Sequence, residues 1–157
     1  MKRTSIGDLA APMLVVAVLA YFLLRIGYGS IPQLQYVEGL PIAALGVAEI
    51  VAARRVRMAV RHVPDAKPMT AIAIARCVAL GKATALVGAG VVGACVAVIA
   101  RVLPDAGTVH AAAADLRVGL ILLAASVFLT VAGVLLERAG IAPRNDRDRV
   151  HDGHYLG

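Results

Sequence analysis

The chain has 157 residues, 60% of them hydrophobic, and a mean hydropathy of +0.81, whereas soluble domains contain about 45–50% apolar residues. This composition argues against an ordinary water-soluble domain and predicts a membrane protein. Lys and Arg outnumber Asp and Glu by 16 to 10, but they border apolar blocks and do not alternate with aromatic residues, so anionic lipid headgroups are the expected partner and nucleic acid is not.

The first predicted helix covers about residues 9–28 and follows an N-terminal segment that contains the basic residues Lys2 and Arg3. It is apolar over Leu9–Leu24, with Pro12 in the first turn, where a helix tolerates proline. A cleaved signal peptide is the alternative reading. However, no Ala-x-Ala site follows, and Arg25 and Ile26 stand where small residues would be needed. We therefore expect a signal-anchor helix.

The second predicted helix covers about residues 37–60, after a short polar turn that contains no Lys or Arg. Glu49 lies inside it, and four arginines end it: Arg54, Arg55, Arg57 and Arg61. Such a cluster fixes membrane topology at the headgroups. A phospholipid-specific site is the alternative that we keep open.

The third predicted helix covers about residues 70–103, with Thr70 as its cap. Its length of about 51 Å exceeds the roughly 30 Å of bilayer hydrocarbon, so its first turns must project from the membrane. Small residues recur at every fourth position: Gly81, Ala85, Ala89, Gly93 and Ala97. This spacing predicts one helix-packing face, because small side chains let backbones approach closely in lipid.

The fourth predicted helix covers about residues 116–138, and Gly140 and Pro143 follow it. Residues 139–157 form a charged cytoplasmic tail that we expect to be disordered. Its His151 and His154 are expected to be solvated rather than metal ligands. The predicted fold class is therefore all-α: a polytopic four-helix transmembrane bundle over residues 1–138.

The distribution of basic residues predicts the orientation in the membrane. With the N-terminus in the cytoplasm and four spans, thirteen Lys and Arg residues face inward and three face outward. The positive-inside rule requires this asymmetry. We expect a multi-pass protein of the inner membrane with both termini cytoplasmic.

Glu49 is the polar residue that the sequence explains least. It precedes Arg54 by about one turn, so an ionised carboxylate there would lie within the hydrocarbon and need a partner. We expect an interhelical ion pair with Lys82, and Arg76 or Arg54 as competing partners. The alternatives are that both side chains reach the headgroups, or that Glu49 lies on a proton or ion pathway. Arg76 is itself expected to contact headgroups.

No motif of catalysis or cofactor binding stands out. There is no phosphate-binding loop, nucleophile elbow, His-Glu-x-x-His or Cys-x-x-Cys, and the glycines of Gly88–Gly93 lie within a span with no strand before them. We therefore expect neither cofactor nor metal, and no enzymatic activity. The leading hypothesis is a non-catalytic subunit or scaffold that packs against itself or a larger membrane protein. The alternative is a small-solute or ion transporter component that uses Glu49.

Short motifs along the chain resemble a known family. They are Arg3-Thr4, Asp8-Leu9, Ala48-Glu49, Ala75-Arg76, Lys82-Ala83 and Glu137-Arg138. Together they are similar to the DUF3180 family of small actinobacterial membrane proteins, over most of residues 1–138. The resemblance implies a cytoplasmic-membrane protein of unknown function, often encoded near folate-biosynthesis genes, and it brings no catalytic residue.

Overall fold

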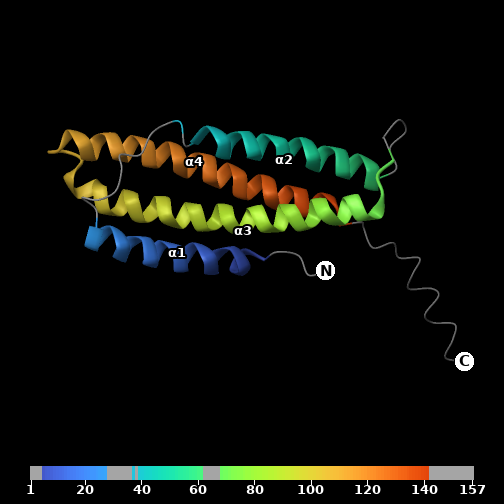
Figure 1. The fold of residues 1–157 in the computed structure, drawn as a ribbon, viewed down its shortest axis with the longest axis horizontal. Helices are drawn as coiled ribbons and strands as arrows, with labels where there is room; N and C mark the ends of the chain where they lie inside the picture. The colour runs from blue at the N-terminus through green and yellow to red at the C-terminus, as the bar shows by residue number, and fades with distance from the viewer. Residues whose placement is uncertain (1–4, 28–36, 38, 62–67, 142–157) are drawn as a thin grey trace, which may run out of the picture.

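The computed structural model describes residues 5–27, 37, 39–61 and 68–141. These residues form four α-helices, and none of them lies in a strand, which confirms the predicted all-α class. The helices are α1 (Ile6–Gly27), α2 (Gly39–Val60), α3 (Ala71–Val102) and α4 (His110–Ala139), with a short 3-10 helix η3 (Leu103–Asp105) after α3 (Figure 1).

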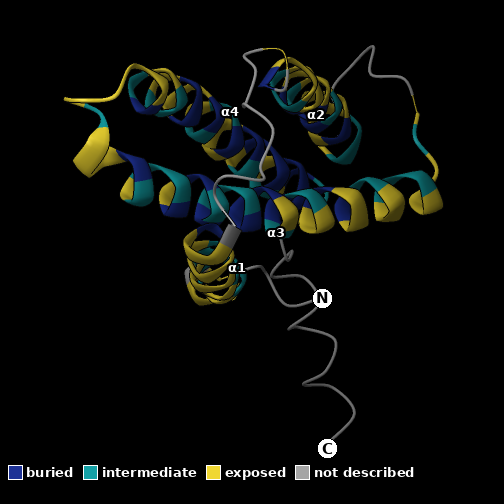
Figure 2. Cartoon of the chain, turned by 60° about the vertical axis from the view of Figure 1, so that its left-hand side comes forward, coloured by how far each residue is buried: buried dark blue, intermediate teal, exposed yellow. Residues whose placement is uncertain are grey.

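The helices lie in a row in the order α1, α3, α4, α2. The antiparallel helices α3 and α4 form the centre, α1 packs on α3, and α2 packs mainly on α4 (Figure 1). Within the described part of the chain, the backbone of α1 packs closely against neither α2 nor α4. Figure 2 shows buried residues concentrated along α3 and α4, while α1 is largely exposed. The two edge helices are thus consecutive in sequence but separated in space.

The local sequence explains where three of the helices begin. Ser5 and Asp8 form a reciprocal capping box, with N–O distances of 2.9 and 3.3 Å, and α1 therefore begins three residues before the predicted start. The Thr70 hydroxyl accepts a hydrogen bond from the Ala73 amide at 3.3 Å and caps α3. Helix α4 begins at His110, six residues before the prediction, because the alanine run that follows has the highest helix propensity.

Glycines bring the backbones of α3 and α4 together. A Cβ atom added to Gly81 would lie 2.7 Å from the Gly133 carbonyl oxygen, and one added to Gly133 would lie 2.7 Å from the Gly81 carbonyl oxygen. Further along, a Cβ atom on Gly88 would lie 2.6 Å from the Thr130 hydroxyl oxygen. This contact has the small-residue character of helix pairs in membranes.

The stripe predicted as one packing face serves two neighbouring helices. All five of its residues are buried: Gly81, Ala85, Ala89, Gly93 and Ala97. Gly81 meets α4, whereas a Cβ atom on Gly93 would collide with the Met13 carbonyl group of α1. A four-residue step overshoots one helical turn by about 40°, so four steps rotate the stripe by about 160°. The single face was therefore an incorrect expectation, and its contacts lie inside the chain.

Three segments are long and apolar enough to cross a membrane: Gly7–Ile26, Ala71–Asp105 and His110–Ala139. Helix α2 is not among them, because Glu49, Arg54 and Arg55 interrupt its apolar sequence. Large apolar side chains are exposed on α1, including Leu23 at 71% and Ile26 at 87%. Such exposure is unfavourable in water and ordinary against lipid.

Candidate functional site: carboxyl groups beside the α3–α4 crossing

Small residues on one side of α2 allow it to pack closely against α4, and this packing positions Glu49. Gly39, Gly46 and Ala53 are buried at seven-residue intervals, a spacing that keeps one side of a helix against its neighbour. At Gly46 an added Cβ atom would lie 2.7 Å from the Phe128 ring and 3.5 Å from the Leu129 Cα atom. The sequence led us to expect α2 against α3. Instead, its buried seam fits α4.

Glu49 lies on this seam, in the middle of α2, and is only 2% exposed. The hydroxyl of Thr84 on α3 lies beside its carboxyl group. That hydroxyl is directed to its own helix, at 2.9 Å from the Leu80 carbonyl oxygen and 3.2 Å from that of Gly81. In the described part of the chain, neither Glu49 carboxylate oxygen has a hydrogen-bond partner.

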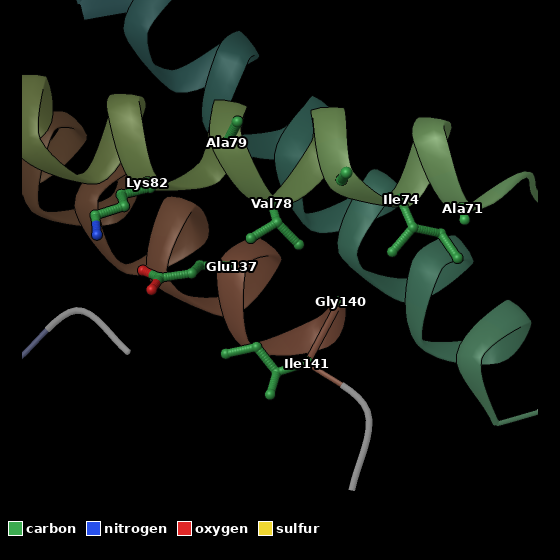
Figure 3. Close-up of a pocket in the computed structure, with 9 residues that line it drawn as sticks. Ala71, Ile74, Val78, Ala79, Lys82, Glu137, Gly140 and Ile141 are labelled. Atoms are coloured by element: carbon green, nitrogen blue, oxygen red, sulfur yellow. The ribbon is translucent and has the colours of Figure 1, made fainter. Parts of the chain in front are cut away.

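A second buried carboxyl group, that of Glu137, lies on the other side of the α3–α4 crossing. Glu137 is 3% exposed and lines a pocket of about 420 Å³ together with Lys82, Val78 and Gly140. In Figure 3 the Lys82 amine and the Glu137 carboxylate point toward one another from α3 and α4. Glu137 was not among the site residues predicted from the sequence.

The predicted ion pair between Glu49 and Lys82 does not form. Lys82 and Thr84 are two residues apart on α3, so they project about 200° apart around its axis. Thr84 faces Glu49, whereas Lys82 faces the pocket with Glu137. Arg76, the expected competitor, is exposed and donates no hydrogen bond to Glu49.

The remaining predicted site residues lie at the surface of the described structure or outside it. The four arginines of the basic cluster are exposed at the end of α2: Arg54, Arg55, Arg57 and Arg61. His151 and His154 lie outside the described residues, as does most of the predicted tail. Within the described ranges, no three metal-ligating side chains gather at one place.

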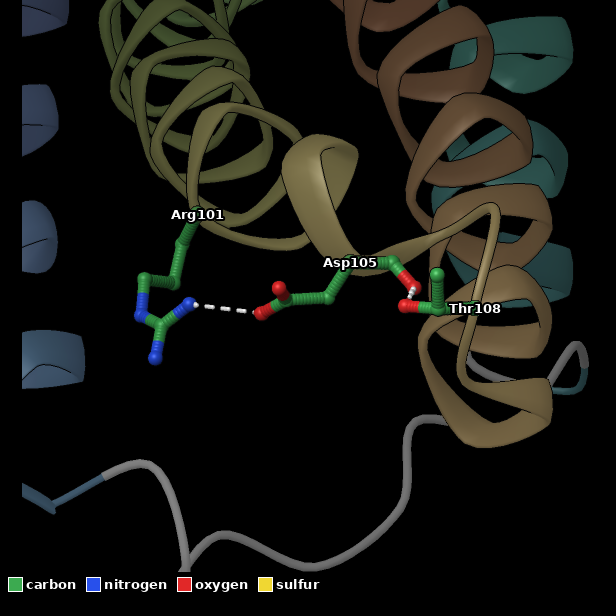
Figure 4. A network of polar contacts seen from close by, with 3 residues as sticks. All are labelled: Arg101, Asp105 and Thr108. Carbon is green, nitrogen blue, oxygen red and sulfur yellow. Dashed lines mark hydrogen bonds and ion pairs between the residues drawn. The ribbon is translucent and has the colours of Figure 1, made fainter.

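The opposite end of the α3–α4 pair is closed by local polar contacts. Arg101 forms an ion pair with Asp105 at 3.3 Å, and the Thr108 hydroxyl donates to the Asp105 carbonyl oxygen at 3.2 Å (Figure 4). The ion pair is partly exposed, and such pairs stabilise a fold by about 0–1 kcal/mol. These contacts are typical of a structural turn.

The comparisons with known proteins identify a family. Residues 9–144 match the family model described as "Protein of unknown function (DUF3180)". No curated protein and no solved structure matches the chain. The match extends from the first turn of α1 to beyond the end of α4 and so includes both buried carboxyl groups. The chain belongs to the DUF3180 family, as the short motifs in its sequence suggested.

Proposed function

We propose that this protein is a non-catalytic subunit or scaffold of the cytoplasmic membrane that acts through helix packing within the bilayer. The observation that carries the proposal is the row of helices, which leaves apolar surface on both edge helices. Leu23 of α1 and Leu40 of α2 are 71% and 67% exposed. A row presents more lateral surface to a partner helix than a closed bundle does.

The proposal includes α2 as a fourth membrane span. Its charged residues weaken its apolar character, but docking on α4 buries Glu49 and leaves the arginines exposed at one end of the helix. Exposed arginines at that end suit anionic headgroups. Together with the basic residues near both termini, they support cytoplasmic placement of the N- and C-termini.

An apolar groove beside α1 supports contact within the bilayer. It has a volume of about 240 Å³ and is lined by residues of α1, α3 and α4, among them Met13, Val92 and Val131. A partner helix or lipid acyl chains would find no charged side chain in this lining. The proposed partners are a second copy of the chain or a larger membrane protein.

Photocrosslinking from the edge of α1 tests the proposal. A photoreactive residue at Leu23, which faces outward, should give a discrete protein adduct in native membranes. The same residue at Leu24, which is 8% exposed and faces the chain itself, is the matched control and should give none. Purification in mild detergent then identifies the partner by mass. Crosslinks to lipid alone at Leu23 would contradict the proposal.

A transporter component is the second candidate, because Glu49 is a buried ionisable group within three packed helices. Substituting Glu49→Gln removes the ionisable proton and preserves the shape of the side chain. A transporter would lose proton flux in proteoliposomes while its abundance stays normal. Unchanged partner recovery with no flux in the wild-type protein would favour the scaffold.

A further inference from the structure

The surroundings of Glu49 do not supply the hydrogen bonds that an ionised carboxylate would require. An ionised carboxylate only accepts hydrogen bonds, and its burial is unfavourable unless donors or a cation compensate it. Both Glu49 oxygens are buried and have no hydrogen-bond partner among the described residues. The site therefore lacks the donors that a negative charge would require.

Thr84 can satisfy the other form of the side chain. Its hydroxyl has one hydrogen, which is directed to the Leu80 carbonyl oxygen at 2.9 Å. Its oxygen keeps lone pairs that can accept a hydrogen bond. A carboxylic acid at Glu49 has an O–H group to donate, so the protonated form finds a partner where the ionised form finds none.

We infer that Glu49 is a proton-binding site, occupied while α2 is docked against α3 and α4, with the Thr84 oxygen as hydrogen-bond acceptor. Binding adds one proton to a carboxylate oxygen and forms an O–H bond there. This inference does not depend on the scaffold function, because it concerns the docking of α2 within one chain.

None of the charged side chains on the helices packed around Glu49 is placed to compensate an ionised carboxylate there. On α3, Lys82 projects to the opposite side, and Cys77 packs against the apolar cluster around Val56. On α4, Glu137 lines the pocket with Lys82. On α2 itself, Arg54 is exposed about one turn away. Helix α1 does not contact α2 in the described structure.

Proton binding at Glu49 must then be linked to the docking of α2. The docked state holds the proton more tightly than a state in which water reaches Glu49. Because the docked state carries more bound protons, its stability falls as the pH rises. Alkaline conditions should therefore loosen α2 from α4, or admit water to the carboxyl group.

The first experiment labels the full-length protein in native membranes with dicyclohexylcarbodiimide, an apolar reagent that modifies protonated carboxyl groups. We expect an adduct on the peptide that contains Glu49, and its yield should fall as the buffer becomes alkaline. Glu49→Gln should abolish this adduct, whereas Glu137→Gln, which alters the other buried carboxyl group, should retain it. An unmodified Glu49 peptide in the wild-type protein would overturn the inference.

Substitutions of Thr84 provide a second experiment. Its readout is the pH dependence of Glu49 labelling, which a purely structural role of Thr84 would not shift in the same way. Thr84→Val removes the acceptor with little change in volume, so the pH at which labelling of Glu49 is half lost should move downward. Thr84→Ser keeps a hydroxyl and should restore the wild-type profile. Identical profiles for Val and Ser would contradict the assignment of Thr84 as acceptor.

The third arm measures docking itself. In a Cys95→Ser background, Ala53→Cys on α2 can be crosslinked to native Cys77, which packs against the cluster that contains Ala53. Thiol reactivity rises with pH, so Glu49→Gln in the same background supplies the reference curve. We expect the wild-type yield to fall below this reference at alkaline pH. Parallel curves, or failure of the neutral glutamine variant to dock, would overturn the linkage.

Discussion

Gly81 and Gly133 pack backbone against backbone, each with its carbonyl oxygen 2.7 Å from the position where the other would carry a Cβ atom. The contact is reciprocal and joins the N-terminal half of α3 to the C-terminal half of α4. Two buried carboxyl groups flank it, Glu49 on the side of α2 and Glu137 in the pocket with Lys82. Both buried carboxyl groups thus lie beside the close approach of two backbones.

A methyl group at this contact should destabilise the fold. We expect Gly133→Ala to lower the free energy of unfolding by about 1–3 kcal/mol, because the two atoms nearest to the added methyl group, the Gly81 carbonyl oxygen and the Ala85 nitrogen, belong to the backbone and cannot rotate away. Titration with a denaturing detergent, followed by circular dichroism, measures the loss.

Gly90→Ala on α3 is the matched control. Its Cβ atom would lie 3.5 Å from a Val16 methyl group, an ordinary contact. Because alanine favours helix over glycine by about 0.5–1 kcal/mol, this variant should be neutral or stabilising. Equal losses for the two variants would argue against backbone contact at Gly133.

The attachment of α1 depends on Gly93. A side chain there would collide with the Met13 carbonyl group, and α3 is the only helix whose backbone packs closely on α1 in the described structure. We expect Gly93→Val to release α1 while α2, α3 and α4 remain packed. A cysteine at Ala17 should become more reactive to an apolar maleimide, whereas native Cys95 should keep its protection. Release of both would indicate general unfolding instead.

The cap of α3 should contribute measurably to stability. Thr70→Ala removes the hydroxyl that accepts from the Ala73 amide and should lower the free energy of unfolding by about 0.5–2 kcal/mol. Thr70→Ser keeps an oxygen at the same place and should recover most of the loss. If the serine variant lost as much free energy of unfolding as the alanine variant, the methyl group of Thr70, and not its capping hydroxyl, would be the source of the stabilisation.

The proposed topology places the turn after η3 outside the cell and the end of α2 inside. In a protein without Cys77 and Cys95, cysteine at the exposed Thr108 should react with an impermeant thiol reagent in intact cells. Cysteine at the exposed Arg61 should react only after the membrane is opened. The reverse pattern would invert the orientation.

The sequence predicted the number and type of helices because apolar blocks and their boundaries are local signals. The hydroxyl groups of Ser126 and Thr130 are equally local, since they donate to carbonyl oxygens of their own helix, those of Leu122 and Ser126, at 2.7 and 2.8 Å. Contacts between helices were harder. The sequence showed that Gly81 and Gly93 belong to a regular series of small residues. However, the rotation of the helix between these two positions decides which neighbouring helix each of them contacts.

The candidate site shows the same limit. Glu49 was recognisable as a buried charge, but its partner depended on whether α2 packs on α3 or α4, which no local pattern decides. Glu137 was overlooked because it lies near the end of a helix, where charges are ordinary. A signal was present, since Gly133, Glu137 and Gly140 recur at helical spacing on one side of α4.

The row of helices has a consequence for biosynthesis. The ribosome delivers α1 and α2 first, yet these two segments end at opposite edges and do not touch in the described structure. In the proposed membrane topology, each waits in the bilayer for a later neighbour, α1 for α3 and α2 for α4. The nascent chain therefore lacks the main packing partners of both helices until α3 and α4 have been synthesised. Helix α2, the least apolar of the four, remains longest without its partner.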